Sequence, residues 1–113
     1  MSLNEPMYQV DVEQRLDLLS QQLEEETERF AAQTVERAEA EYSYKRAYHK
    51  AVLTSTEGTV AMKEARAFTK SSQEYREYKI TEALEKATQQ KLMAIRSQID
   101  SARTISANIR NLT

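Results

Sequence analysis

The segment from Glu41 to Leu53 reads EYSYKRAYHKAVL and has the residue types that single-stranded nucleic acid requires. Aromatic rings stack on bases, and cationic side chains neutralise phosphates. Tyr44 and Tyr48 are four residues apart, so on a helix they share one face. The cations of the segment are Lys45, Arg46 and Lys50. One alternative stays open, in which the two tyrosines pack between helices with their hydroxyl groups at the rim.

A second group of cations follows the next turn of the chain. Lys63, Arg66 and Lys70 recur at steps of three and four, so they also share a helical face. With the first segment, they predict a basic surface near one end of a helical hairpin. Binding of nucleic acid there should weaken steeply with salt, because phosphate contacts release counterions.

Residues for catalysis, metal binding or cofactor binding are scarce. The chain has one histidine, His49, which lies among cations, and it has no cysteine and no glycine-rich phosphate loop. Nucleophilic catalysis needs a nucleophile, a base and an orienting group that converge in a pocket. The acidic run 24–28 is typical of a solvated helix face, and without a loop it is no specific metal signature. We expect no enzyme activity, cofactor, metal or small-molecule substrate.

The composition indicates a helical protein. The 113 residues include one Gly and one Pro, which leaves few turns and excludes a β-rich fold. The chain lacks a signal-peptide pattern and any apolar run near the ~20 residues that span a bilayer. The absence of cysteine fits a reducing compartment. These features predict a soluble cytoplasmic protein without a membrane partner.

Charge is distributed unevenly along the chain. Residues 1–41 have eleven Asp/Glu and three Arg, a net charge of −8, whereas residues 42–113 have thirteen Lys/Arg and seven Asp/Glu, a net charge of +6. Either the acidic arm pairs with the basic part, within or between subunits, or the basic part binds nucleic acid.

The expected elements form a single all-α domain with two long helices in a hairpin, coiled-coil-like and oligomeric. We expect a loose leader over 1–10, a helix over 11–53, a turn over 54–59 and a helix over 60–112 with a break at 71–73. Asp11 and Gln14 resemble a capping box at the first helix start. Gly58 fits a positive φ at the turn. A heptad-like seam is formed by Val12, Leu16, Leu19, Leu23 and Phe30.

The last part of the chain has an apolar stripe with helical spacing. We expect it to be the oligomerisation face, made of Leu92, Ile95, Ile99, Ala102, Ile105 and Ile109. Beside it, Arg96, Arg103 and Arg110 recur every seven residues. Pairing with the acidic first helix is the simplest role for these arginines.

The stretch KLMAIRSQIDSARTISANIR resembles the C-terminal helix of the UvsY family of phage recombination mediators. The matching positions are Leu92, Ala94, Ile95, Arg96, Ser97, Ala102, Arg103 and Ile105. The resemblance implies a phage protein of the host cytoplasm that binds single-stranded DNA and forms ring-like oligomers through its C-terminal helix. It further implies that the protein loads a recombinase against a single-strand-binding protein, with DNA contacts at Lys45 and Arg46.

Two other functions remain open from the sequence. The seam and the C-terminal stripe would suit a coiled-coil structural or assembly protein of a phage particle. The acidic first helix would suit a small inhibitor that mimics DNA and binds a host nucleic-acid enzyme.

Overall fold

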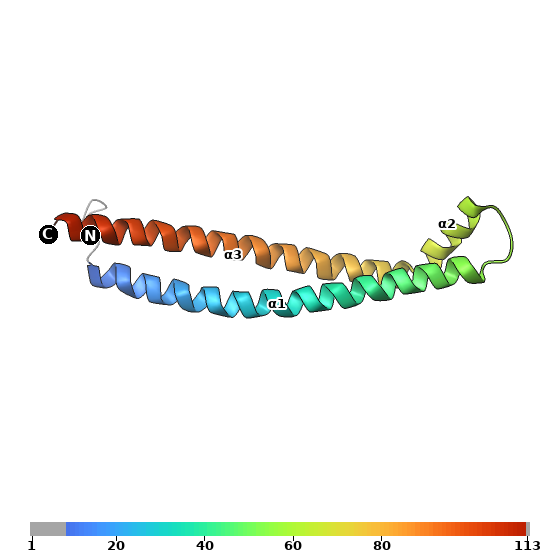
Figure 1. Cartoon of the computed structure of the whole chain (residues 1–113), viewed down its shortest axis with the longest axis horizontal. Helices are drawn as coiled ribbons and strands as arrows, with labels where there is room; N and C mark the ends of the chain where they lie inside the picture. Colours follow the sequence, from blue (N-terminus) through green and yellow to red (C-terminus); the bar gives the residue numbers. More distant parts are fainter. Residues whose placement is uncertain (1–8, 113) are drawn as a thin grey trace. The chain divides into compact units, whose positions relative to one another are not determined.

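The computed structural model describes residues 9–112, which form three helices (Figure 1). These are α1 (Gln9–Thr54), α2 (Val60–Lys70) and α3 (Ser72–Leu112). Within this range there is no strand. The all-α class is thus confirmed, with two long helices and an interruption of the second near Ser71.

The helix bounds differ slightly from those expected. Helix α1 begins at Gln9, two residues before the expected start, and ends at Thr54, one residue beyond the expected end. Asp11 therefore lies in the first turn of the helix and does not form a capping box with Gln14 at its start. Of the expected leader, residues 1–8 lie outside the described residues.

The turn between α1 and α2 depends on glycine at one position. Gly58 has φ +98°, which L side chains rarely adopt. A Cβ at this position would also lie 3.0 Å from Nη2 of Arg66. The side-chain oxygen of Thr59 then accepts a 3.2 Å hydrogen bond from the backbone N–H of Met62, which caps α2.

A single residue separates α2 from α3. Ser71 is completely buried, and its Oγ donates a 2.7 Å hydrogen bond to the carbonyl of Ala67. Its backbone N–H binds the same carbonyl at 3.0 Å. The break expected at 71–73 therefore lies at Ser71, where the hydroxyl and the backbone both close the last turn of α2.

The described part of the chain divides into two compact units. We call residues Phe30–Ala87 the turn unit, because it contains the end of α1, the turn, α2 and the start of α3. We call Met1–Arg29 with Thr88–Thr113 the terminal unit, of which the structure describes 9–29 and 88–112. In both units α1 and α3 lie side by side and run in opposite directions (Figure 1).

The terminal unit is held together by a heptad seam. Leu19 of α1 packs with Ile95 and Ile99 of α3, and Leu16 and Leu23 border this cluster. The buried residues of α3 recur at alternating steps of four and three, as in a coiled coil; they are Thr88, Leu92, Ile95, Ile99, Ala102 and Ser106. This confirms the coiled-coil-like interpretation for the terminal unit.

The seam differs from the expected stripe at one position. A step of four from Ala102 leads to Ser106, which is buried and accepts a 2.8 Å hydrogen bond from Gln9 Nε2. Ile105 lies outside this register and is 41% exposed. From Ala102, a step of three to Ile105 and a step of four to Ser106 both keep a residue on the same helical face, so the apolar stripe alone could not show which one is buried. The alternation of steps of four and three in a coiled-coil seam selects Ser106.

A buried carboxylate interrupts the apolar seam of the terminal unit. Glu26 occupies a seam position and is 6% exposed. Its Oε1 accepts hydrogen bonds from Lys91 at 3.0 Å and pairs with Arg29 at 3.2 Å. Its Oε2 is buried without a hydrogen-bond partner. The interruption of the apolar pattern near this residue is thus a seam position occupied by a buried carboxylate, which pairs with two exposed cations.

Candidate nucleic-acid interface

The turn unit has an aromatic seam built around Tyr44. The ring of Tyr44 lies 5.0 Å from that of Tyr75, 6.0 Å from that of Tyr78 and 6.1 Å from that of Tyr48. Phe68 of α2 joins through Tyr75, at 5.2 Å. Tyr44 and Tyr48 are half-buried in this cluster. They therefore pack between helices, as in the alternative left open above, and Tyr44, at the centre of the cluster, is not a free platform for bases.

A charged group at Tyr78 supports the aromatic seam. Lys79 Nζ lies 2.9 Å from Oε1 of Glu82. This hydrogen bond is the main cause that lowers the pKa of Glu82 and raises that of Lys79. Hydrogen bonding to Glu82 also raises the pKa of Tyr78. The three pKa shifts thus have one origin, the interaction of the Glu82 carboxylate with Lys79 and Tyr78.

Ion pairs join α1 and α3 further along the same unit. Arg37 Nε lies 3.3 Å from a carboxylate oxygen of Glu85, and its Nη1 lies 3.3 Å from one of Glu41. The other oxygen of Glu41 pairs with Lys45 at 3.2 Å. Lys45, a predicted DNA contact, is therefore already engaged with a carboxylate, although its side chain remains 62% exposed.

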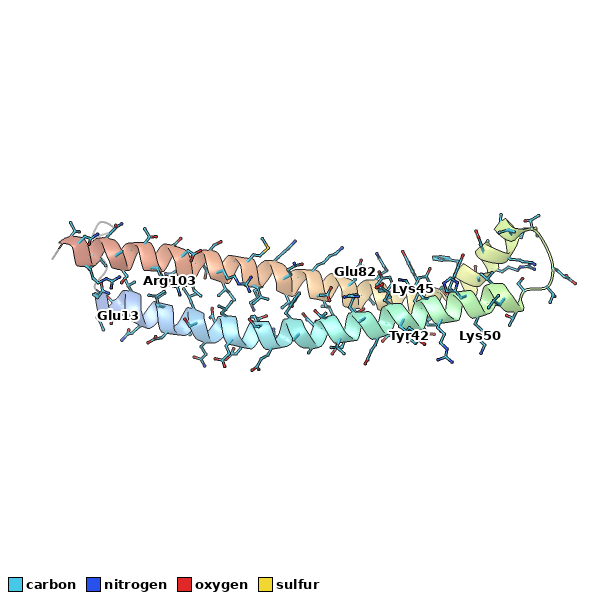
Figure 2. All side chains as sticks on the ribbon, viewed as in Figure 1. Glu13, Tyr42, Lys45, Lys50, Glu82 and Arg103 are labelled. Carbon is cyan, nitrogen blue, oxygen red and sulfur yellow. The ribbon has the colours of Figure 1, made fainter. Side chains whose placement is uncertain are left out.

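The other predicted cations have no such partner. Within residues 9–112 none of them forms an ion pair with a carboxylate; they are Arg46, Lys50, Lys63, Arg66 and Lys70. Four are exposed and Lys63 is half-buried. Lys50 projects from the side of α1 that faces away from α3 (Figure 2). Arg66 is held at the turn by a hydrogen bond that it donates to the carbonyl of Glu57.

These five cations lie on the end of α1 and on α2, and we call them the turn-end basic surface. Residues 44–70 have six Lys/Arg and two Glu, a net charge of +4. The remaining residues of the turn unit have net charges of −2 over 30–43 and −1 over 71–87. Positive charge in this unit is therefore concentrated around the turn, on the two elements that the sequence predicted.

Four residues of the predicted oligomerisation stripe pack within the chain itself. Leu92, Ile95, Ile99 and Ala102 are buried within the terminal unit of the same chain. Ile109 is half-buried. A second copy could reach the first four residues only by displacing α1, so this face is used within one chain.

For Arg96 and Arg103, the predicted pairing with the acidic helix does not occur among residues 9–112. Arg96 and Arg103 are exposed and make no ion pair with the described part of the acidic helix. The charged contact between α1 and α3 in the terminal unit is made by Lys91 with Glu26. The register of the seam determines which side chains of α3 reach the acidic helix. The recurrence of arginine every seven residues did not reveal that register.

One exposed ring was not singled out from the sequence. Tyr42 is 66% exposed and projects from α1 away from α3 (Figure 2). Its position two residues before Tyr44 puts it on a different helical face from the aromatic seam. Spacing from Val35 and Ala38 was the signal that could have identified it.

Residues 9–112 offer neither a metal site nor a membrane-spanning helix. No group of three or more His, Asp or Glu side chains there is arranged to hold a metal ion. None of the three helices is long and apolar enough over its described length to cross a membrane. No protein-family model, curated protein or solved structure matches this chain.

Proposed function

We propose that this protein is a non-enzymatic, single-stranded DNA-binding protein and that its turn-end basic surface contacts the phosphates. One observation carries the proposal: among residues 9–112 the five cations around the turn form no ion pair with a carboxylate, whereas Arg37, Lys79 and Lys86 of the same unit do. Unpaired cations on adjoining elements suit a phosphate backbone, which presents one charge per nucleotide.

The exposed edge of the aromatic seam supports a single strand over a duplex. Tyr48 is half-buried, and His49 beside it is exposed, with the two rings 5.6 Å apart and edge to face. Lys50 follows directly. Unpaired bases can reach rings beside cations, whereas the bases of a duplex are stacked inside it.

A more specific role is recombination mediation in the host cytoplasm. The resemblance of residues 91–110 to UvsY supports this role, in which the protein loads a recombinase onto strands covered by single-strand-binding protein. A phage-type recombinase on covered DNA should then begin strand exchange sooner when this protein is added. An unchanged lag would contradict mediation while leaving DNA binding itself intact.

The test of DNA binding is fluorescence anisotropy with a labelled oligo(dT) strand at low salt. Replacing Lys50, Lys63 and Lys70 by Gln should weaken binding at least tenfold, since three phosphate contacts are lost. The matched control replaces Arg15, Arg96 and Arg103 of the terminal unit by Gln, which changes the net charge equally. Equal loss in both variants, or no binding by the wild type, would refute the proposed surface. A duplex competitor should displace the strand poorly.

A second candidate is a coiled-coil assembly protein. The heptad seam of the terminal unit and the exposed apolar side chains Val35 and Tyr42 favour it. It predicts a tight complex of several chains that does not respond to DNA.

A further inference from the structure

Helix α1 has a second apolar stripe that the described residues, 9–112, leave uncovered. Ala31, Val35, Ala38 and Tyr42 follow one another at steps of four, three and four, so they share one face of the turn unit's α1 segment. Val35 is 57% and Tyr42 is 66% exposed. Tyr42 points away from α3 in Figure 2. Val35, Ala38 and Tyr42 line a shallow groove together with Glu39 and Ser43.

Charges of opposite sign stand at the two ends of this stripe. Continuing the same steps along α1 leads back to Glu28 and Glu24, and forward to Lys45 and His49. No ion pair of Glu24 or Glu28 occurs among the described residues. The face therefore runs from acidic through apolar to basic along one helix.

We propose that this face of α1 pairs with the same face of a second copy, with the two helices antiparallel about a twofold axis. Reversing the second helix places Val35 opposite Ala38 and Ala31 opposite Tyr42. In the same register, Glu28 faces Lys45 and Glu24 faces His49. Glu28 thus meets the opposite charge of Lys45, and each large apolar side chain meets a small one, which lets the two surfaces interdigitate.

Because the stripe complements itself, we expect a second copy of the chain to cover it, with the two helices antiparallel. A parallel pair would place Glu28 against Glu28 and Lys45 against Lys45, which repel. In a twofold pair the same patch of each chain contacts the other. The patch must therefore complement its own copy when that copy runs in the opposite direction, as this stripe does. The alternating steps of four and three are those of a coiled-coil seam.

The pairing needs no change in the rest of the chain. The stripe takes no part in the aromatic seam, whose α1 residues include Tyr44 and Tyr48 on another face. Lys45 keeps enough exposure, 62%, to meet a second carboxylate while it pairs with Glu41. This pairing does not depend on DNA binding, although two linked basic surfaces would bind one strand with greater avidity.

Engineered cysteines test the register without background, because the chain has no cysteine. Ala31→Cys and Tyr42→Cys are prepared as separate chains, checked for helical circular dichroism, then mixed and oxidised mildly. The mixture should form a disulfide between the two variants. Neither variant alone should cross-link, because its two cysteines would lie about 16 Å apart along the axis, beyond the ~4.4–6.8 Å that a disulfide allows between Cα atoms.

Self-linking of either variant alone, or no cross-link in the mixture, would overturn the antiparallel register. Sedimentation equilibrium provides the second readout. Glu28→Lys and Lys45→Glu should each raise the dimer dissociation constant roughly tenfold, and the double variant should restore it. A wild-type chain that stays monomeric at all concentrations would leave the face to another partner or to solvent and would overturn the proposal. A larger assembly that Val35→Asp does not dissociate would equally contradict it.

Discussion

The buried carboxylate of Glu26 gives the sharpest prediction about stability. It lies in the seam of the terminal unit beside Leu23, and one of its oxygens is buried without a partner. Its two cationic partners have side chains that are 57% and 59% exposed. We expect Glu26→Leu to stabilise the fold, because leucine completes an apolar seam and removes a buried charge.

The magnitude follows from the contacts. The variant loses two ion pairs with exposed cations, each of which contributes about 0–1 kcal/mol. It gains about 1.5–3 kcal/mol from burial of leucine and about 1–3 kcal/mol from removal of the unpaired oxygen. The net increase in the free energy of unfolding should be about 2 kcal/mol, within the range seen when buried ion pairs are replaced by apolar residues.

Urea unfolding followed by circular dichroism measures this difference, at one protein concentration so that any self-association contributes equally. The control is Glu25→Leu. Glu25 is the residue before Glu26 and its side chain is exposed, so this substitution should change stability by less than about 0.5 kcal/mol. A loss of more than about 1 kcal/mol in Glu26→Leu, at unchanged denaturant slope, would show that the charged group stabilises the seam and would refute the reasoning.

Two further predictions concern the turn unit. Tyr44→Ala should lower the free energy of unfolding by about 2 kcal/mol, roughly half the loss for a fully buried ring, while Tyr42→Ala at low concentration should change it little in the same urea assay; equal losses would contradict the assignment of Tyr44 to the seam. The lowered pKa of Glu82 means that its ionised form contributes stability above the ordinary glutamate pKa, and that this contribution is lost as the pH falls through the lowered value. Glu82→Gln should therefore lose less stability than the wild type on acidification, and parallel pH curves would show that its pairing with Lys79 does not matter.

The helices could be predicted from the sequence because their signals are local. The scarcity of glycine and proline, the single turn at Gly58 and the weak point at Ser71 each act within a few residues. Helix ends were less certain, since Asp11 and Gln14 resemble a capping box and yet α1 also includes Gln9 and Val10.

The pairing between helices was harder to predict because it depends on both partners. The C-terminal stripe showed an apolar face but not which chain covers it, and steps of three and four allowed either Ile105 or Ser106. Tyrosines and cations stood together in the sequence, yet packing separates them: Tyr44 enters the seam, whereas Lys50 stays at the surface. The residue types therefore indicated a basic site, but only the packing of the helices shows which of its tyrosines and cations face solvent.

The salt dependence of binding to oligo(dT) tests the central claim most directly. With four to five phosphates contacted by the turn-end basic surface, the plot of log affinity against log salt concentration should have a slope of about −3. Replacing Lys50, Lys63 and Lys70 by Gln should reduce the magnitude of that slope by about 2. A slope that is the same in this variant as in the wild type, or one that changes equally in the Arg15, Arg96 and Arg103 control, would contradict the assignment of DNA binding to the turn.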